Sequence, residues 1–345
     1  MAHSASDLVR YHQLLVRSLR SAGLSVHAIL DPARLAASVP QAWWLLGRLR
    51  PAALFTTGGY LAVPLVLAAR ARGIPTLVWE GNVVAGRATR VIGRVATSVA
   101  VSFPPTLAAF PSNGFVSGTP IRSFAGVDRT AARASFEIGA DERLLLVFGG
   151  SQAVARINAA LAGALPRLLA DWRLLHLAGA AGMTEAAALA ASLPTELRNR
   201  YRAEAHLTDR MADALAAADL VVGRAGSSTC AEVTAVGVAS ILVPYPYAGG
   251  HQRYNAAYLA DEGAALLVPD EELDADRLVA EVARLRDDAA RHAMADSARR
   301  LGRPDAAHDL AERVLALAER REPPRDGKAP VGAASDRSGD RENAS

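Results

Sequence analysis

The chain has 345 residues, of which 51% are hydrophobic and only 5% aromatic, and its formal net charge is +3. This length fits two domains with a short excess, and the small net charge gives no argument for a nucleic-acid partner. The single cysteine, Cys230, excludes an intrachain disulfide and a thiolate metal cluster, which favours a reducing, cytoplasmic compartment. The sequence shows neither a signal peptide nor an apolar run long enough to span a bilayer, so we expect a soluble or peripheral protein.

The first half of the chain alternates predicted helices and strands. Hydrophobic periodicity predicts an amphipathic helix from Asp7 to Gly23, a strand over 25–30 and a second amphipathic helix over 39–49. Short apolar runs predict further strands, with a glycine turn after the first of them and a helix over 87–95; these strands are 52–57, 76–80, 98–103 and 114–117. The polar passage from Gly118 to Asp128 is the best domain boundary.

The second half repeats the pattern. Strands are predicted over 143–148, 173–176, 201–206, 219–223, 240–244 and 264–268, with helices between them and onward to about Arg321. Repeated strand–helix units predict an α/β protein with a doubly wound parallel sheet in each half. We assign residues 1–124 to an N-terminal domain and 125–321 to a C-terminal domain. Residues 322–345 are poor in large apolar side chains, which predicts a disordered tail.

The most informative segment, from Ala217 to Ala256, joins a buried-strand pattern to a glycine-serine turn and a helix. Ligands of parallel sheets bind beyond the carboxyl ends of the strands, where this turn lies. The candidate phosphate and ribose ligands are Ser227, Ser228, Thr229 and Glu232. Turn amides can face a phosphate while a carboxylate early in the helix accepts hydrogen bonds from two ribose hydroxyls. The alternative is an ordinary turn with a serine or threonine N-cap, followed by an exposed helix glutamate.

A second glycine-rich turn, at Gly149, Gly150 and Ser151, follows the first strand of the C-terminal half. Its glycines would let backbone amides approach a diphosphate, although tight strand-to-helix turns use glycine in any case. His251 and Gln252 stand at a predicted helix start, where they could reach sugar hydroxyls in an interdomain cleft or simply cap the helix.

Polar residues also follow strands of the first domain. Glu80 and Asn82 follow one strand and Arg122 lies in the last turn of the domain, so all three could line the opposite wall of the cleft. A lone arginine is usually solvated, so only the neighbouring residues support Arg122 as a candidate site residue.

Several segments keep a fixed order over roughly residues 40 to 310, namely Thr57-Gly-Gly-Tyr60, Glu80-Gly-Asn82, Gly118-Thr-Pro-Ile-Arg122, Gly149-Gly-Ser-Gln152, Asp209-Arg-Met211, Arg224-Ala-Gly-Ser-Ser-Thr229 and His251-Gln252. No single segment is decisive, but the ordered series is highly specific. It resembles the MurG-type peptidoglycan GlcNAc transferases of glycosyltransferase family 28.

The resemblance implies a GT-B fold, in which two Rossmann-like domains face each other across a cleft. It implies inverting transfer of GlcNAc from UDP-GlcNAc to the 4-hydroxyl of MurNAc in undecaprenyl-pyrophosphoryl-MurNAc-pentapeptide. UDP-GlcNAc is then a substrate, and neither a cofactor nor a metal is implied, because amides and dipoles stabilise the departing UDP.

The resemblance also implies roles for individual residues. Glu232 would hold the ribose, the backbone at Leu207 and Thr208 would meet the uracil, and His251 and Gln252 would hold GlcNAc. The diphosphate would be held by Ser227, Ser228, Thr229 and Ser151, beside Gly149 and Gly150. Asn82 and Arg122 would belong to the cleft wall, and the acceptor side would comprise Gly58, Gly59, Tyr60 and Glu80.

The N-terminus departs from the family pattern. Members begin with a strand and a loop of the form Gly-Gly-Thr-Gly-Gly-His, which supplies a candidate general base, and this chain has no such loop. His3 and His12 sit in no matching context. A missing first strand would leave a groove in a sheet of 3-2-1 order, so we expect an incomplete N-terminal domain and a translation start upstream of Met1. The alternatives are a degenerate protein that binds UDP-sugar without catalysis, or a transferase with another lipid or natural-product acceptor.

The lipid acceptor implies a peripheral protein on the cytoplasmic side of the cell membrane, with the cell-wall synthesis machinery as a possible partner. In the second predicted helix, one stripe comprises Val39, Ala42, Trp43, Leu46 and Leu49, while Trp44 and Leu45 lie beside it. Two adjacent tryptophans cannot face the same core. Either they form an interfacial patch with the nearby arginines, or one is a core residue with an exposed neighbour.

Overall fold

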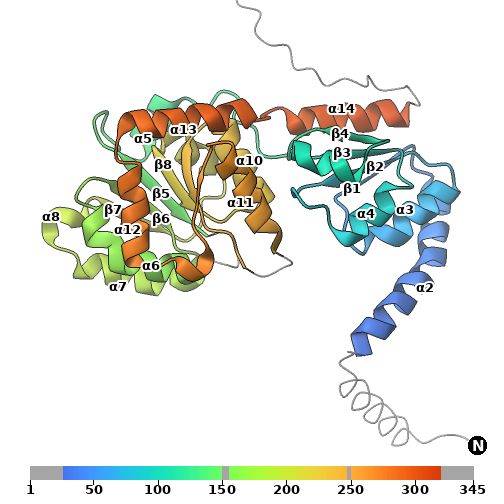
Figure 1. Cartoon of the computed structure of the whole chain (residues 1–345), viewed down its shortest axis with the longest axis horizontal. Coiled ribbons are helices and arrows are strands. Elements are labelled where there is room, and N and C mark those ends of the chain that lie inside the picture. The colour runs from blue at the N-terminus through green and yellow to red at the C-terminus, as the bar shows by residue number, and fades with distance from the viewer. Residues whose placement is uncertain (1–25, 150–154, 247–249, 320–345) are drawn as a thin grey trace, which may run out of the picture.

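The computed structural model describes residues 26–149, 155–246 and 250–319, with side chains from Ser38 onward. These residues form two α/β domains that lie side by side (Figure 1). The expected helix from Asp7 and the expected tail from Glu322 lie outside the described residues.

The N-terminal sheet consists of four parallel strands in the order β1-β2-β3-β4, which are Leu54–Thr56, Thr76–Glu80, Ser98–Val101 and Gly114–Val116. Two helices and a 3-10 turn connect them: α3 (Ala62–Ala71), α4 (Arg87–Gly93) and η1 (Pro104–Ala109). β2 has the predicted bounds, whereas β1, β3 and β4 are slightly shorter than predicted. Because consecutive strands are neighbours throughout, the described sheet has no internal groove of the kind that a lost central strand would leave.

The prediction of a strand over 25–30 was wrong. The chain forms one long helix there, α2 (Val26–Leu49), which also contains the helix predicted over 39–49. A short apolar run cannot by itself distinguish a strand from a helix segment, and the Ala- and Leu-rich residues that follow favour the helix. Side chains of α2 that face α3 are buried at Ala42 and Leu46. No helix in the described ranges is long and apolar enough to cross a bilayer.

The C-terminal sheet consists of six parallel strands in the order β10-β9-β8-β5-β6-β7. In chain order from β5 to β10 they are Leu144–Phe148, Arg173–Leu177, Tyr201–Glu204, Leu220–Gly223, Ala239–Leu242 and Leu266–Leu267. This is the doubly wound 3-2-1-4-5-6 order, in which the strand order reverses between β5 and β8. The predicted α/β fold is confirmed, and the reversal marks the crevice where such sheets bind ligands.

Helices cover both faces of this sheet (Figure 1). They are α5 (Arg129–Ser135), α6 (Ala155–Leu168), α7 (Met183–Ser192), α8 (Thr195–Arg198), α9 (Met211–Ala217), α10 (Ser227–Val236), α11 (His251–Asp261), α12 (Ala275–Arg284) and α13 (Asp288–Leu301), with 3-10 turns η2 (Ala180–Gly182) and η4 (Asp270–Glu272). The central strands are accordingly buried on both sides, and β5, β8 and β9 carry almost entirely apolar side chains.

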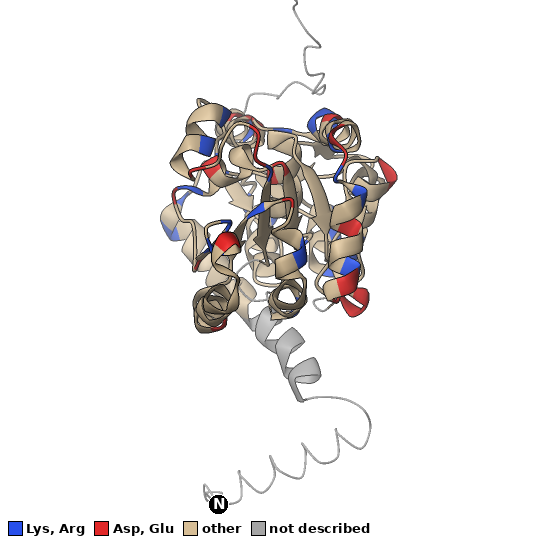
Figure 2. Cartoon of the chain, turned by 90° about the vertical axis from the view of Figure 1, so that its left-hand side faces the viewer, with Lys and Arg blue, Asp and Glu red and all other residues tan. Residues whose placement is uncertain are grey.

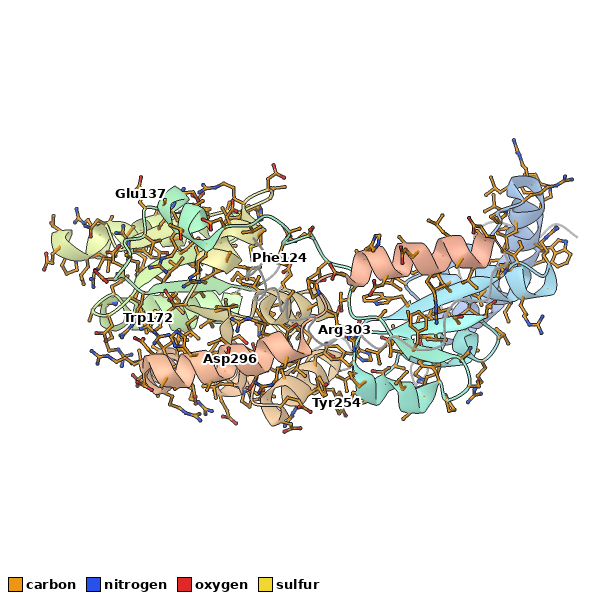
Figure 3. The ribbon with its side chains drawn as sticks, turned by 90° about the horizontal axis from the view of Figure 1, so that it is seen from above. Phe124, Glu137, Trp172, Tyr254, Asp296 and Arg303 are labelled. Carbon is orange, nitrogen blue, oxygen red and sulfur yellow. The ribbon has the colours of Figure 1, made fainter. Side chains whose placement is uncertain are left out.

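The last described helix, α14 (Ala306–Ala318), packs against the N-terminal sheet, although the sequence boundary at 321 places it with the C-terminal domain. Its Leu310 and Leu317 are buried against Leu77 and Ala100 of β2 and β3. Seen from above, α14 lies along the N-terminal domain, and Phe124 and Arg303 lie between the two domains (Figure 3). The chain therefore crosses between the domains twice.

Charged residues of both signs are interspersed over the outer end of the C-terminal domain (Figure 2). Ion pairs of this domain join Arg173 to Glu142 and Arg202 to Glu204. This end of the molecule therefore presents no extended field of one sign to a charged partner.

Candidate nucleotide-sugar site

The N-terminus of α10 lies directly beyond the carboxyl end of β8, next to the end of β5, since Phe148 pairs with Gly223. Its N-cap is Gly226, and no side chain caps the helix. The reading of this turn as an ordinary serine or threonine N-cap is therefore wrong. The first amides of α10, at Ser227, Ser228 and Thr229, remain without helical acceptors, and the helix dipole adds positive potential there. Such an end binds phosphate.

Glu232 lies in the second turn of α10 and is largely buried. Its Oε1 accepts a hydrogen bond of 2.9 Å from Nε of Arg122, and Nη1 of Arg122 donates to the carbonyl oxygen of Thr208 at 3.2 Å. The structure thus brings together three residues that the sequence placed on opposite walls of the cleft. The alternative of an exposed helix glutamate is wrong.

Gln252 and His251 begin α11, on the side of the α10 turn. Oε1 of Gln252 accepts from the backbone amides of Ala225 and Tyr245, at 3.2 and 2.9 Å, so it ties the turn after β8 to the turn after β9. Nδ1 of His251 is buried and has no hydrogen-bond partner among the described residues. Neither side chain caps α11, so the capping alternative is wrong for both.

Glu80 organises the loop after β2. Its Oε1 accepts from the backbone and side-chain nitrogens of Asn82, at 3.1 and 3.2 Å, and its Oε2 accepts from the amide of Gly86 at 2.9 Å. Glu80 is buried with its oxygens so occupied. It therefore fixes the conformation of the loop after β2.

Asn255 joins that loop to the C-terminal domain. It is fully buried on α11; its Oδ1 accepts from the amide of Val83 at 3.0 Å, and its Nδ2 donates to Oδ1 of Asn82 and to the carbonyl of Ala225 at 3.2 and 3.1 Å. Two loops that belong to different domains thus meet at one amide. Asn255 was not predicted as an interdomain contact, because its partner Asn82 lies 173 residues away in the sequence.

The glycine turn after β1 lies at the same carboxyl edge of the sheet as Glu80. Gly58 and Gly59 both adopt left-handed conformations, with φ of 77° and 82°, and a Cβ on Gly58 would lie 2.6 Å from Oγ1 of Thr89. Glycine is therefore required at 58 by both conformation and space. Tyr60 is exposed beside this turn.

A charge cluster in which Arg224 and Asp270 are buried supports the same edge of the C-terminal sheet, and the sequence did not predict it. Arg224, directly after β8, donates to Asp270 and to the carbonyl of Val243, and Arg156 of α6 pairs with the second oxygen of Asp270 at 3.1 Å. Arg224 belongs to a matching segment, but nothing in the sequence pointed to Asp270. The cluster ties the start of α6 to the turn before α10.

A second missed network surrounds His176 on β6. Its Nδ1 lies 2.9 Å from the hydroxyl of Tyr201 and its Nε2 lies 3.0 Å from Oδ1 of Asn158, whose Nδ2 donates to the carbonyl of Ala178. The neutral ring therefore accepts at Nδ1 and donates at Nε2. Burial lowers the pKa of His176 to about 4.

This network predicts an acid-sensitive contribution to stability. The unfolded chain takes up the His176 proton near pH 6.5 and the folded chain only near pH 4, so protonation favours unfolding. The contribution is complete above pH 6.5 and is lost as the pH falls toward 4, by about 3 kcal/mol. Urea unfolding between pH 7 and 4.5 should show a smaller acid loss in His176→Gln than in the unmodified chain. The exposed His292→Gln should behave like the unmodified chain; equal acid losses in all three would contradict the expectation.

Of the predicted site residues, Gly149 is described and buried at the end of β5, whereas Gly150 and Ser151 lie outside the described residues. The same holds for His3 and His12. The described part of the site thus comprises the α10 turn, Glu232 with Arg122, the start of α11 and the loop after β2.

Comparison with known proteins identifies the family to which the chain belongs. Residues 2–101 match the N-terminal domain of glycosyltransferase family 28, and residues 144–310 match the C-terminal domain of that family. A protein of Salinibacter ruber named UDP-N-acetylglucosamine–N-acetylmuramyl-(pentapeptide) pyrophosphoryl-undecaprenol N-acetylglucosamine transferase is 38% identical, covering 90% of this chain and 83% of the relative. A protein of the same name from Chlorobium phaeobacteroides is 37% identical, covering 90% and 85%.

Solved structures agree. The crystal structure of MurG from Acinetobacter baumannii matches with a TM-score of 0.71 and 31% identity, covering 82% of this chain and 79% of that one. The calicheamicin glycosyltransferase CalG4 matches with a TM-score of 0.59 at 17% identity, covering 94% and 83%, which shows a shared fold. In sequence and in fold, the chain belongs to glycosyltransferase family 28 and, within it, to the MurG-type transferases.

Proposed function

We propose that the protein is a hexosyltransferase that transfers GlcNAc from UDP-GlcNAc to the 4-hydroxyl of MurNAc in undecaprenyl-pyrophosphoryl-MurNAc-pentapeptide. This reaction converts lipid I to lipid II in peptidoglycan synthesis. The transfer inverts the anomeric carbon: the 4-hydroxyl oxygen forms the new bond on the face opposite to UDP while the bond to the diphosphate breaks.

One observation supports the proposal most directly. The uncapped N-terminus of α10 and the carboxylate of Glu232 on the same helix lie close to the loop after β2, which belongs to the other domain. The amides of Ser227, Ser228 and Thr229 would bind the diphosphate, and Glu232 would accept hydrogen bonds from the ribose. His251 and Gln252 would hold GlcNAc. The two backbone amides that bind Oε1 of Gln252 fix its side chain, and Nε2 would then donate to a sugar hydroxyl. Asn82 and the turn at Gly58 would line the acceptor side.

The reaction would need no metal or cofactor, because fixed amides and the dipole of α10 would stabilise the negative charge that develops on departing UDP. The uracil would meet the backbone at Leu207 and Thr208, beyond the end of β7. A chelator should therefore leave the rate of transfer unchanged.

The direct test is incorporation of labelled GlcNAc from UDP-GlcNAc into a short-chain lipid I analogue by the purified full chain, with and without EDTA. Formation of the disaccharide product in both reactions supports the proposal. Binding of UDP-GlcNAc without product would instead support a UDP-sugar-binding protein that lacks catalysis, and transfer only to other lipid or natural-product acceptors would redefine the substrate.

We further propose that the protein is peripheral on the cytoplasmic side of the membrane, where it would meet its acceptor and the cell-wall synthesis machinery. The apolar patch consists of Trp43, Trp44, Leu45 and Leu49 at the end of α2, all exposed. Neither tryptophan is a core residue, so the alternative of one core tryptophan is wrong. Arg72 stacks on Trp43 and Arg48 lies over Trp44, at 4.1 and 5.6 Å from the ring centroids. Aromatic rings flanked by arginines suit an anionic lipid surface.

Substitution of Trp44 and Leu45 by serine should lower partitioning to anionic phospholipid vesicles by about tenfold or more, because two apolar side chains would no longer enter the interface. Trp44 is 62% exposed, so the change should leave folding intact. The matched control is Leu315→Ser on α14, which is equally exposed at 62% but lies away from the patch. Vesicle sedimentation measures the effect; equal partitioning of the two variants would argue against the patch.

A further inference from the structure

The N-terminal domain carries an excess of positive charge that its own acids do not balance. Residues 38–124 contain eight arginines and one acid, Glu80, whose two oxygens are occupied by the loop after β2. In the C-terminal domain, by contrast, exposed arginines pair with acids, as Arg167 does with Asp276. The unbalanced arginines of the N-terminal domain therefore favour an anionic ligand.

Three of these arginines lie on one face of α4. Arg87, Arg90 and Arg94 follow one another at intervals of three and four residues, and all three are exposed. None of them pairs with a carboxylate in the part of the chain that the structure describes. Like charges one turn apart on a helix repel each other, so this face is stabilised when an anion binds to it.

Arg90 and Arg94 border an open cavity of about 480 Å³. Its other walls consist mainly of small apolar side chains from the loop after β2 and from η1, among them Val83, Val84, Ala85, Pro105 and Ala108. The cavity thus combines apolar walls with two guanidinium groups. A peptide matches this combination, because its side chains can pack on the apolar walls while its carboxylates accept hydrogen bonds from arginine.

The cavity lies beside the interdomain cleft. The amide of Val83, in the cavity wall, donates to Oδ1 of Asn255 in the C-terminal domain at 3.0 Å. The acceptor of the proposed reaction carries its peptide on the lactyl group at C3 of MurNAc, next to the reacting 4-hydroxyl, and its diphosphate across the ring at C1. An extended pentapeptide spans about 17 Å, so a peptide that starts in the cleft is long enough to follow the cavity wall toward α4.

We propose that this cavity binds the peptide stem of the acceptor, with Arg90 and Arg94 pairing with its carboxylates. The inference rests on the proposed function, because it takes the acceptor to be a muramyl pentapeptide on a lipid diphosphate. It makes the two arginines specificity-determining residues, which recognise the substrate at a group that takes no part in the reaction.

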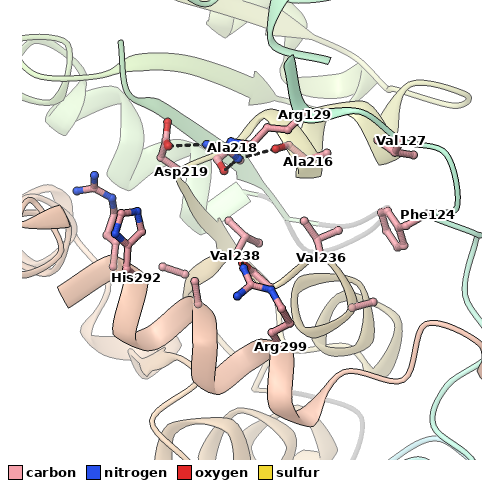
Figure 4. A pocket seen from close by; sticks show the side chains of 15 residues that line it. Phe124, Val127, Arg129, Ala216, Ala218, Asp219, Val236, Val238, His292 and Arg299 are labelled. Carbon is pink, nitrogen blue, oxygen red and sulfur yellow. Dashed lines mark hydrogen bonds and ion pairs between the residues drawn. The ribbon is translucent and has the colours of Figure 1, made fainter. Parts of the chain in front are cut away.

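A second cavity provides a contrast and part of the control. It measures about 430 Å³, lies at the amino-terminal ends of β8 and β9, and is bordered by Arg299, whose 58% exposed side chain pairs with Asp296 at 2.7 Å (Figure 4). Arg70 of α3 is exposed in the N-terminal domain and borders neither cavity. The control variant Arg70→Gln/Arg299→Gln removes the same net charge as Arg90→Gln/Arg94→Gln.

The test compares two short-chain lipid I analogues at saturating UDP-GlcNAc, one with the full pentapeptide and one whose lactyl carboxyl is capped as a methylamide. The unmodified chain should prefer the pentapeptide acceptor in kcat/KM. In Arg90→Gln/Arg94→Gln, kcat/KM for that acceptor should fall about tenfold or more through KM, because charge-assisted hydrogen bonds are lost, while use of the methylamide acceptor should not change. Arg90→Lys/Arg94→Lys should keep part of the preference, and the control variant should keep all of it.

Calorimetric titration with soluble muramyl pentapeptide tests the site without turnover. The unmodified chain and the control variant should bind this peptide alike, and Arg90→Gln/Arg94→Gln should bind it about tenfold more weakly or worse. Equal binding by all three proteins would overturn the inference.

The kinetic results could overturn it as well. An equal loss with both acceptors would indicate a role in diphosphate binding or in folding, and an undiminished preference would show that the arginines do not recognise the peptide. Weaker partitioning of Arg90→Gln/Arg94→Gln to anionic phospholipid vesicles, with unchanged acceptor kinetics, would assign the two arginines to a lipid surface instead. If the unmodified chain binds the peptide but transfers GlcNAc to neither acceptor, the proposed function fails while the peptide site stands.

Discussion

Asp270→Ala is expected to lower the free energy of unfolding by about 3–5 kcal/mol, because it removes the carboxylate that neutralises the buried guanidinium of Arg224. Arg224 is only 5% exposed, and its Nη1 pairs with Oδ1 of Asp270 while also donating to the carbonyl of Val243 at 3.1 Å. Arg156 would lose its 3.1 Å pairing in the same step. Urea unfolding at neutral pH measures the change.

The matched control is Asp276→Ala, which breaks the pair between Asp276 and Arg167. Both of these side chains are largely in solvent, at 87% and 46% exposure, so that loss should stay below about 1 kcal/mol. If Asp270→Ala lowered the free energy of unfolding no more than the control does, the cluster around Arg224 would not be the stabilising link between α6 and α10 that its geometry indicates.

Glu232→Ala is expected to reduce kcat/KM for UDP-GlcNAc by about 10²- to 10⁴-fold, because charge-assisted hydrogen bonds to two ribose hydroxyls would be lost. The nucleotide is bound alike in the ground state and the transition state, so most of the loss should appear in KM. Arg122 would lose its carboxylate partner but keep its hydrogen bond to the Thr208 carbonyl, and at 42% exposure it can be hydrated, so the fold should persist.

Steady-state kinetics with varied UDP-GlcNAc and a saturating acceptor analogue provide the measurement, with circular dichroism to verify folding. Glu185→Ala removes an exposed acid from the first turn of another helix of the same domain, α7, and should keep the unmodified kinetics. A Glu232→Ala enzyme with unchanged KM would contradict the ribose assignment.

The sequence was most informative about the C-terminal sheet. Runs such as Leu144–Phe148 and Leu220–Gly223 are apolar throughout, which is typical of strands buried on both faces, and they are strands in the structure. The sequence was least informative where packing decides. The segment at 26–30 carries a short apolar run that suits either element, and α14 is an amphipathic helix whose pattern does not say which sheet it covers.

For the candidate site, the sequence placed polar residues at the carboxyl edges of the two sheets but did not give their partners. Glu80, Asn82 and Gln252 were predicted to line the site, and the structure adds that each also forms hydrogen bonds to neighbouring loops. The contact of Arg122 with Glu232 spans 110 residues and depends on how the two domains dock. Such contacts follow from tertiary geometry, for which local patterns carry no signal.

The double passage of the chain between the domains limits how the cleft can move. The two passages touch, since a Cβ on Gly118 would lie 2.8 Å from Cβ of Arg303. Two domains joined by adjacent segments are held at a nearly constant separation where those segments run. A relative rotation of the domains would therefore displace the rim far from the two segments more than the rim beside them.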